Sequence, residues 1–192
     1  MATRVVIAED EAIIRLDLKE LLEEEGYEVV GQTGRGDEAV ELVRALGPDA
    51  VILDIKMPGL DGLSAARQIT ADRLAAVLIL TAFSQRELVE QAREAGAIGY
   101  LVKPFQKSDL IPALELAIGR HQEMQSLEAE IGDLAERLEA RKAIDRAKGV
   151  LMDAHGLGEQ DAWRFLQTTA MDRRSKVHEV AALVIAGDIT PA

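Results

Sequence analysis

The chain has 192 residues, of which 48% are apolar and only 3% aromatic, so aliphatic side chains and alanine must fill its core. It contains no cysteine, which excludes a disulfide scaffold, thiolate zinc sites and a cysteine nucleophile. The formal net charge of −12 argues against binding of nucleic acid through bulk charge. The sequence shows no signal-peptide pattern and no apolar run of membrane-spanning length, so we expect a cytoplasmic protein with no membrane partner.

The charge is unevenly distributed along the chain. Residues 141–192 carry eight Lys and Arg against seven Asp and Glu, whereas the first 140 residues carry 14 against 27. A shift of charge balance often accompanies a change of domain. We therefore expect a domain boundary near this point, with a nearly neutral module at the end of the chain.

Five short apolar runs alternate with helical patterns in the first 120 residues. Strands that alternate with helices of this length indicate a parallel sheet covered on both faces. We predict an α/β domain over residues 1–120, with its second helix capped by Asp37 and its last helix beginning near Ser108. The predicted strands are 5–8, 28–30, 50–53, 76–80 and 98–102, and the apolar positions of the first helix are Ile13, Leu16, Leu18, Leu21 and Leu22.

A heptad pattern follows this domain and predicts a coiled-coil linker helix over residues 121–140. Its apolar positions recur at spacings of 3, 4, 3 and 4, with charged residues between them. Arg141 and Asp145 occupy the next two positions, so the pattern is short. Two interpretations stay open, namely pairing with a second copy of the chain and an amphipathic helix that lies on its own protein. The apolar positions are Met124, Leu127, Ile131, Leu134 and Leu138.

Residues 141–192 predict a small all-α module of three helices. The first helical pattern is stopped by Gly156 and Gly158, and the third is expected to be capped by Ser175 and ended by Gly187. The apolar positions of the three patterns are Ile144, Ala147, Leu151 and Ala154, then Ala162, Phe165, Leu166 and Thr169, then Val177, Val180, Ala181 and Val184.

Chemically active side chains follow four of the five predicted strands. In an open parallel sheet, ligands bind at the carboxyl ends of the strands, near the point where the strand order reverses. We therefore expect these side chains to meet at one edge of the sheet. They are Glu9, Asp10 and Glu11 after the first strand, Asp54 after the third, Thr81 after the fourth and Lys103 with Pro104 after the fifth.

This set of side chains suits phosphoryl transfer to a carboxylate. Clustered carboxylates are hard oxygen ligands that suit Mg²⁺, and Asp54 is a competent phosphoryl acceptor once the incoming oxygens are neutralised. Mg²⁺ and the Lys103 ammonium would neutralise them, and the Thr81 hydroxyl could bond to a third oxygen. Taken singly, Asp10 and Thr81 could be helix caps and Lys103 a surface lysine. Their coincidence at successive strand ends favours the phosphoryl-acceptor site.

The same segments resemble the receiver domain of two-component response regulators. The resemblance rests on residues 5–11 (VVIAEDE), 53–62 (LDIKMPGLDG), 80–82 (LTA) and 100–105 (YLVKPF). It implies a flavodoxin-like sheet of strand order 2-1-3-4-5 and a sensor histidine kinase that phosphorylates Asp54. It implies no enzymatic activity beyond phosphotransfer and autodephosphorylation.

The receiver resemblance also implies roles for individual residues. Mg²⁺ would be held, directly or through water, by Glu9, Asp10, Asp54 and the backbone carbonyl of Lys56. Thr81 and Tyr100 would form a switch that rearranges on phosphorylation, and the peptide bond before Pro104 would be cis. Glu9 stands where many members of the family have aspartate, a substitution that keeps the carboxylate.

A glycine motif in the same region offers a competing interpretation. Residues 34–39 fit G-x-G-x-x-A, and Asp54 follows at about the spacing of a ribose-binding acid in a dinucleotide-binding oxidoreductase. However, the motif follows the second predicted strand, and the chain after it is too short for a second nucleotide-binding half. This interpretation also leaves four residues unexplained, so we do not favour it: Glu9, Asp10, Thr81 and Lys103.

The last module resembles the ANTAR domain, a three-helix RNA-binding output module of transcription antitermination regulators. The resemblance rests on residues 141–152 (RKAIDRAKGVLM), 161–166 (DAWRFL) and the pair 170–171. It implies binding to hairpin RNA of the nascent transcript whose loop bases are unpaired, which suits recognition by stacking and by basic side chains. The candidate RNA contacts are Lys142, Arg146, Lys148 and Trp163, with a second basic cluster of Arg173, Arg174 and Lys176.

These observations predict a phosphorylation-controlled response regulator that acts as a transcription antiterminator. Phosphorylation of Asp54 would release the tail or promote its dimerisation. Two alternatives stay open for the tail: it could bind duplex DNA, or it could contact only protein within a phosphorelay. The basic residues of the tail could also form nothing more than a solvated helix surface.

Overall fold

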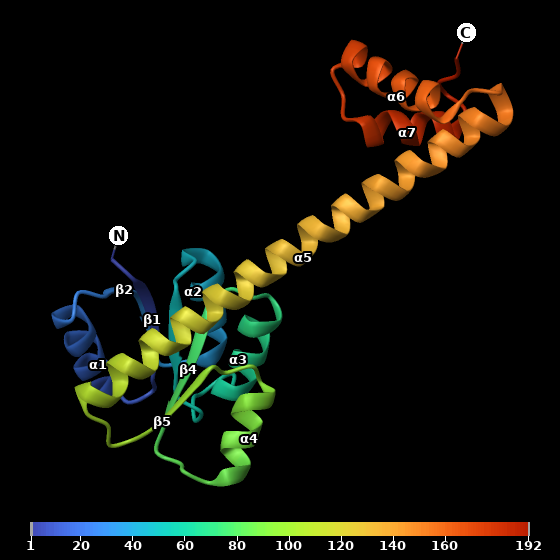
Figure 1. Cartoon of the computed structure of the whole chain (residues 1–192). Coiled ribbons are helices and arrows are strands. Elements are labelled where there is room, and N and C mark those ends of the chain that lie inside the picture. The colour runs from blue at the N-terminus through green and yellow to red at the C-terminus, as the bar shows by residue number, and fades with distance from the viewer. Residues whose placement is uncertain (1, 192) are drawn as a thin grey trace. The chain divides into compact units, whose positions relative to one another are not determined.

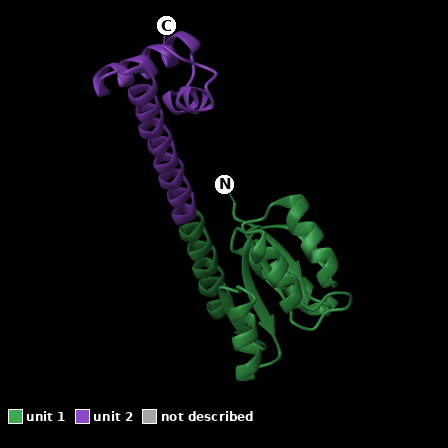
Figure 2. Cartoon of the chain, turned by 90° about the vertical axis from the view of Figure 1, so that its right-hand side faces the viewer, with its two compact units in different colours: residues 1–125 green, residues 126–192 purple. Residues whose placement is uncertain are grey.

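The computed structural model describes residues 2–191, which divide into two compact units. Unit 1 comprises residues 1–125 and unit 2 residues 126–192 (Figure 2). The division falls inside a single long helix, α5 (Lys107–His155). None of the helices within residues 2–191 combines the length and the apolar character needed to cross a membrane.

Unit 1 is built on a five-stranded parallel sheet of order β2-β1-β3-β4-β5, which confirms the predicted flavodoxin-like fold (Figure 1). Apart from Thr81 at the end of β4, the strands β3 and β4 consist of aliphatic residues, and they are buried on both faces of the sheet. Neighbouring strands end close together, as shown by the pairing of Ala8 with Leu53 and of Leu53 with Ile79. The strands are β1 (Arg4–Ala8), β2 (Glu28–Thr33), β3 (Ala50–Leu53), β4 (Ala76–Thr81) and β5 (Gly99–Val102).

Helices cover both faces of this sheet and enclose two apolar cores. One face packs against α1 (Ala12–Glu24) and the beginning of α5, through Leu18, Leu22, Leu110 and Leu114. The other face packs against α2, α3 and α4, which contribute mainly small and branched side chains. These three helices are α2 (Gly36–Leu46), α3 (Gly62–Ala71) and α4 (Arg86–Glu94).

Two of the apolar positions expected in the first helix do not face the core. Ile13 is 77% exposed and Leu16 is 53% exposed, whereas Leu18 and Leu22 are buried. At 100° per residue, Ile13 and Leu16 lie on a different side of α1 from Leu18 and Leu22. Because the helix lies on only one face of the sheet, a single side of it is covered.

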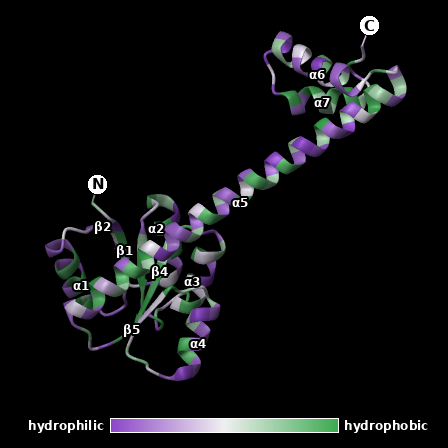
Figure 3. Ribbon diagram, viewed as in Figure 1, coloured by the Kyte–Doolittle hydropathy of each residue, from purple (hydrophilic) through white to green (hydrophobic). Residues whose placement is uncertain are grey.

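Helix α5 is continuous through three segments that the sequence analysis separates. It contains the last receiver helix, the heptad segment and the first helix of the tail. At about 1.5 Å per residue, its 49 residues extend about 74 Å. Figure 3 shows hydrophobic and hydrophilic residues alternating along the ribbon of α5. All five heptad positions from Met124 to Leu138 are more than half exposed in the single chain.

Unit 2 forms its own small core from three helices. The end of α5 contributes Ala147 and Leu151, and α6 (Glu159–Arg173) and α7 (Val177–Ala186) supply the rest. The expected Ala154 is exposed, because the core of α5 ends one turn earlier. The buried residues of the two later helices are Ala162, Leu166 and Ala170 of α6 and Val180, Ala181 and Val184 of α7.

Two predicted helix caps are wrong. Helix α2 begins at Gly36 after the N-cap Arg35, and Asp37 lies in its first turn, where its carboxylate pairs with Arg35 at 2.6 Å. The N-cap of α7 is Lys176, whose backbone N–H donates to the Glu179 carboxylate at 3.0 Å. The hydroxyl of Ser175 is buried and finds no hydrogen-bond partner among residues 2–191, so this side chain does not cap the helix.

The glycine motif at residues 34–39 has a packing explanation. A Cβ on Gly36 would lie 2.0 Å from the carbonyl oxygen of Leu60, which no side chain can tolerate. Glycine is therefore needed where the start of α2 contacts the loop before α3. This contact accounts for the glycine without a nucleotide, in agreement with the rejection of the oxidoreductase interpretation.

Removal of the α3 cap is expected to destabilise unit 1 in a pH-dependent way. Asp61 accepts a hydrogen bond from Ser64 N at 2.9 Å, and its loss in Asp61→Ala should cost about 1 kcal/mol at neutral pH. Burial alone raises the pKa of Asp61, but the hydrogen bonds from Ser64 outweigh it and hold the pKa below its ordinary value of 3.8. The stabilisation is therefore present above pH 3.8 and lost as the pH falls through the lowered pKa.

Urea unfolding of wild type, Asp61→Ala and Asp61→Asn between pH 7 and pH 3 measures this effect. Asparagine can accept the same hydrogen bond without titrating, so Asp61→Asn should keep most of the stability at pH 7. Equal unfolding midpoints for Asp61→Ala and wild type at pH 7 would contradict the prediction.

Candidate functional site

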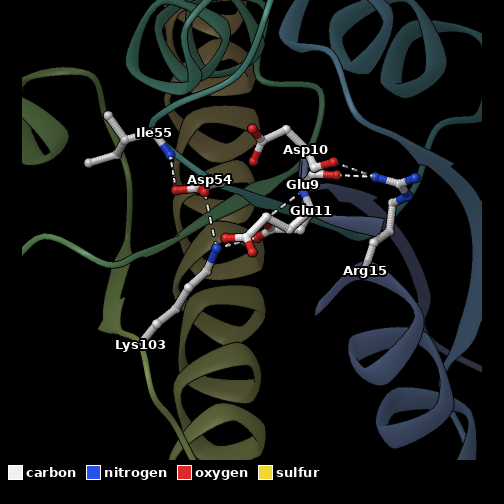
Figure 4. Close-up of polar contacts among 7 residues, drawn as sticks. All are labelled: Glu9, Asp10, Glu11, Arg15, Asp54, Ile55 and Lys103. Atoms are coloured by element: carbon white, nitrogen blue, oxygen red, sulfur yellow. Dashed lines mark hydrogen bonds and ion pairs between the residues drawn. The ribbon is translucent and has the colours of Figure 1, made fainter. Parts of the chain in front are cut away.

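The carboxylates predicted at the strand ends come together at one edge of the sheet. Glu9 and Asp10 follow β1 and Asp54 follows β3, and one carboxylate oxygen from each of the three lies within 4.8 Å of the other two (Figure 4). Glu9 and Asp54 are buried, whereas Asp10 is exposed at the mouth of the cluster. Three acids so close together require a cation to compensate their charge.

Lys103 supplies a positive charge from the loop after β5. Its Nζ donates to Glu9 Oε2 at 2.5 Å and to Asp54 Oδ2 at 3.0 Å, and only 10% of its side chain is exposed (Figure 4). Burial by itself lowers the pKa of Lys103, but the hydrogen bonds to Glu9 and Asp54 more than offset this and raise it above its ordinary value. Lys103 is thus held as an ammonium beside Asp54.

Burial has the opposite effect on Glu9. Desolvation raises the pKa of the Glu9 carboxyl above its ordinary value of 4.5, even though the hydrogen bond from Lys103 lowers it. The negative charge of Glu9 therefore depends on compensation by a nearby cation. Because Glu9 is buried, its carboxylate needs either Lys103 or a metal ion beside it to remain charged.

The backbone fixes the position of Asp54. Its Oδ1 accepts a hydrogen bond from the N–H of Ile55 at 2.6 Å, which leaves Oδ2 directed to Lys103 (Figure 4). The carbonyl of Ile55 accepts from Gly62 N at 2.8 Å, and a Cβ on Gly62 would lie 1.8 Å from the Asp54 carbonyl oxygen. Gly62 is therefore needed for the close approach of α3 to the acceptor loop.

One contributor to the site was missed by the sequence analysis. The Arg15 guanidinium, from the first turn of α1, donates to the backbone carbonyl of Glu9 and approaches that of Asp10 at 3.5 Å (Figure 4). This contact holds the acidic loop without neutralising its carboxylates. A basic residue one helical turn after an acidic loop was the available signal, but the pattern is common on helix surfaces.

The donor set fits Mg²⁺. The three carboxylates offer hard oxygen ligands from two loops, and Asp10 leaves the cluster open to solvent on one side, where waters and a phosphoryl oxygen could complete the coordination. The Lys56 ammonium lies 4.2 Å from the centroid of the Phe83 ring, so this side chain is directed to the aromatic ring.

The predicted switch residues do not contact each other through a hydrogen bond in this structure. The Thr81 hydroxyl is fully buried and has no hydrogen-bond partner among the described residues. Tyr100, by contrast, donates its hydroxyl to the carbonyl of Phe83 at 2.6 Å. The peptide bond between Lys103 and Pro104 is cis, as the receiver resemblance implies.

In unit 2 the predicted RNA contacts differ in their surroundings. Lys148 is only 20% exposed at its side chain and pairs with Asp145 at 3.0 Å and Glu159 at 3.1 Å, so it joins α5 to the start of α6. Lys142 is exposed and pairs with Glu139 at 2.7 Å. Arg146 is exposed, and no ion pair of this residue is found within residues 2–191.

The remaining candidates lie on or after α6. Trp163 is 38% exposed and so presents part of its indole to solvent. The second basic cluster is exposed between α6 and α7, where Arg173 ends α6, Arg174 is its left-handed C-cap with a φ of 51°, and Lys176 precedes α7. The structure therefore places this cluster at the connection between two helices.

Comparison with known proteins assigns a family to each part of the chain. Residues 5–115 match the model of the response regulator receiver domain, and residues 132–185 match that of the ANTAR domain. The chain is 57% identical over 182 residues to the transcriptional regulatory protein PdtaR of Mycobacterium tuberculosis, an alignment that covers 95% of this chain and 89% of that protein. The receiver part is 41% identical over 115 residues to the chemotaxis protein CheY of Thermotoga maritima, covering 59% of this chain and 96% of CheY.

Solved structures agree with the receiver fold. The signal receiver domain of the response regulator NarL from Mycobacterium tuberculosis superposes with a TM-score of 0.59 and 33% sequence identity. The superposition covers 62% of this chain and 98% of that domain.

Proposed function

The chain belongs to the response regulators in which a receiver domain is joined to an RNA-binding ANTAR domain, and we propose that phosphorylation of Asp54 controls its action as a transcription antiterminator. The observation that carries the proposal is the cluster of Glu9, Asp10, Asp54 and Lys103 at one edge of the sheet. This cluster supplies an acceptor, a cation and ligands for a metal ion.

The proposed phosphoryl donor is a phosphohistidine of a sensor kinase. An Asp54 carboxylate oxygen attacks the phosphorus and forms the P–O bond of an acyl phosphate, while the P–N bond breaks and its electron pair goes to the ring nitrogen. The phosphohistidine ring carries a proton on its other nitrogen, so the histidine leaves as a neutral imidazole. Lys103, now 3.0 Å from Asp54, binds a phosphoryl oxygen, and the buried Thr81 hydroxyl donates to another. Glu9, Asp10, Asp54 and the Lys56 carbonyl would hold Mg²⁺, which would supply further neutralisation of charge. Water later hydrolyses the acyl phosphate, which is the only other reaction we propose.

The proposed output is binding to hairpin RNA of a nascent transcript. A base stacked on the exposed part of Trp163 and phosphates bound by Lys142, Arg146 and the cluster at residues 173–176 would provide such a contact. The nearly neutral charge of the tail limits binding to this local patch. Formation of the complex would prevent a terminator hairpin from forming.

The exposed heptad positions of α5 support a second copy of the chain as a partner. Met124, Leu127, Ile131, Leu134 and Leu138 are each more than half exposed. Pairing of two copies along this stripe would cover them and would bring two RNA-binding units to one transcript. We propose that phosphorylation favours this dimer.

Ultraviolet crosslinking to cellular RNA tests the proposed function. Wild type and Asp54→Asn are treated with the phosphodonor acetyl phosphate and Mg²⁺, crosslinked to total RNA, and the bound fragments are sequenced. We expect wild type to enrich hairpins upstream of coding regions and Asp54→Asn to enrich them much less. Equal enrichment by both would contradict control by phosphorylation.

Two outcomes of the same experiment would favour the alternatives for the tail. Preferential retention of duplex DNA in a parallel measurement would indicate a DNA-binding regulator. No affinity for either nucleic acid, with or without phosphodonor, would indicate a tail that contacts only protein.

A further inference from the structure

Charged residues stand at both ends of the apolar stripe of helix α5. The heptad positions a and d carry apolar side chains from Met124 to Leu138. Continuing the same spacing places Arg120 before them and Arg141 and Asp145 after them. All three charged side chains are exposed in the single chain. A second helix that covers the stripe must therefore meet these charges as well.

Parallel pairing of two copies would set each of these charges against itself. In a parallel pair, an a or d residue lies opposite the same residue of the second copy. Arg120 would face Arg120, Arg141 would face Arg141, and Asp145 would face Asp145. Like charges brought together across an interface are unfavourable, so this orientation has a repulsive contact at each end of the apolar stripe.

Antiparallel pairing gives the same charges favourable neighbours. In this orientation, each a residue lies opposite a d residue of the second copy. The arginine at position 120 then meets an opposite charge, and the aliphatic stem of the arginine at position 141 covers a methionine. The layers, from the centre of the pair outward, are Ile131 with Leu134, Leu127 with Leu138, Met124 with Arg141 and Arg120 with Asp145.

The charges also distinguish this register from its nearest antiparallel alternative. Sliding one copy by a heptad would place Leu127 opposite Ile131 and Arg120 opposite Leu138. Asp145 would then come opposite Ala113, which lies in the part of α5 that packs on the sheet of unit 1. The arginine and the aspartate would both lose an opposite charge, so this register is less favourable.

A basic residue beside the stripe favours the antiparallel orientation independently. Arg137 occupies heptad position g, and charges at positions e and g set the orientation of coiled coils. Parallel pairing would bring Arg137 next to Lys142 of the second copy, which repels it. Antiparallel pairing in the register above would bring it next to Glu130 of the second copy, which attracts it.

The ion pairs within α5 are the same in both orientations. Arg120 pairs with Glu123 at 3.3 Å and Asp145 with Lys148 at 3.0 Å. In the same way, Arg137 pairs with Asp133 at 2.8 Å and Lys142 with Glu139 at 2.7 Å. These contacts join neighbours on one helix, so they do not depend on the direction of the second copy. The two orientations differ in what the second copy adds, which is repulsion in one and attraction in the other.

We propose that two copies of the chain pair along α5 in antiparallel orientation, with Arg120 of each copy beside Asp145 of the other. The inference rests on the proposed dimer and adds its orientation and register. At about 1.5 Å per residue, the two copies of Arg146, a proposed RNA contact, lie about 40 Å apart along the pair. A transcript bound by both copies is therefore held at two separate points.

Disulfide crosslinking determines the orientation, because the chain has no cysteine of its own. Full-length Leu127→Cys carrying an affinity tag and untagged Leu138→Cys are each treated with acetyl phosphate and Mg²⁺, singly and as a mixture, and oxidised with diamide. The antiparallel pair brings the two cysteines of the mixture face to face, so we expect a disulfide dimer of one tagged and one untagged chain. Neither variant alone should crosslink, because its two cysteines are about 16 Å apart along the pair, too far for a disulfide.

Charge reversal tests the contact at the ends of the stripe. Asp145→Arg should weaken the dimer about tenfold, because repulsion replaces attraction at two equivalent exposed contacts. Arg120→Asp combined with Asp145→Arg should recover most of the wild-type affinity. Glu136→Arg changes the net charge as much as Asp145→Arg does, but at heptad position f, so it should leave the affinity unchanged. Analytical ultracentrifugation of the full chains with acetyl phosphate and Mg²⁺ gives these dissociation constants.

Four outcomes would overturn the proposal. Disulfide dimers from Leu127→Cys alone and from Leu138→Cys alone would show a parallel pair. A dimer in ultracentrifugation with no disulfide in any sample would place the interface away from this stripe. Failure of the double charge reversal to recover the affinity would exclude the contact between Arg120 and Asp145. A wild-type chain that stays monomeric with the phosphodonor would contradict the proposed dimer itself.

Discussion

Asp54→Asn is expected to abolish phosphorylation of the chain. The amide keeps the shape of the side chain and can still accept from Ile55 N, which lies 2.6 Å from Oδ1. It lacks the anionic oxygen that attacks phosphorus, so no acyl phosphate can form. Mass spectrometry of the intact protein after incubation with acetyl phosphate and Mg²⁺ should show one added phosphoryl group in wild type and none in the variant.

The control for this experiment is another acid near the site. Asp61→Asn alters a carboxylate that caps α3 and lies outside the acidic cluster, so its labelling should match wild type. Labelling of Asp54→Asn at the wild-type level would assign the acceptor to another side chain. Loss of labelling in both variants would trace the effect to the fold of the loop before α3.

Lys103→Met should give the largest loss of stability in unit 1. Methionine keeps much of the apolar stem but leaves Glu9 and Asp54 buried without the ammonium at 2.5 Å and 3.0 Å. Removal of one partner from a buried ion pair typically costs about 3 kcal/mol or more. The comparison is Lys107→Met, which breaks a surface pair with Glu25 and should change the stability by less than about 1 kcal/mol.

The loss in Lys103→Met should depend on pH and on Mg²⁺. Burial already raises the pKa of Glu9, and removal of the Lys103 charge raises it further. A carboxyl with a raised pKa in the folded state stabilises below its unfolded value, here 4.5, and this contribution is lost as the pH rises through the folded pKa.

In urea unfolding, Lys103→Met should therefore be only slightly less stable than wild type near pH 4.5 and much less stable at pH 7. Millimolar Mg²⁺ should restore part of the stability at pH 7, because it neutralises the same carboxylates. A deficit that is independent of both pH and Mg²⁺ would show that Lys103 contributes through packing alone.

The edge of the sheet at which the site lies was predictable, because residues that directly follow parallel strands lie at the same edge. Once alternating strands and helices imply a parallel sheet, Glu9, Asp54 and Lys103 must lie at the same edge. The geometry of the hydrogen bonds was not predictable. Arg15 binds a backbone carbonyl of Glu9, an acceptor that every residue has, so the sequence offers nothing that distinguishes this contact.

The continuity of α5 was also not evident in the sequence. A change in charge balance and the end of the heptad pattern at Arg141 suggested separate elements, but neither contains a helix-stopping signal. The stop comes at Gly156, which has a φ of 68° and follows the last residue of the helix. The cap at α7 shows a related difficulty, because Ser175 is a favoured capping residue whose hydroxyl is buried beside the actual N-cap, Lys176.

The Thr81 hydroxyl finds no hydrogen-bond partner among residues 2–191, and this lets us estimate how strongly phosphorylation could shift the protein between two states. A buried hydroxyl without a hydrogen bond costs about 1–3 kcal/mol, and a phosphoryl oxygen on Asp54 would remove that cost. This free energy shifts a two-state equilibrium by about 5- to 150-fold. Conversion from 1% to 99% of an active state needs about 5.5 kcal/mol. We therefore expect this contact alone to give a graded response, in which the unphosphorylated protein keeps measurable output.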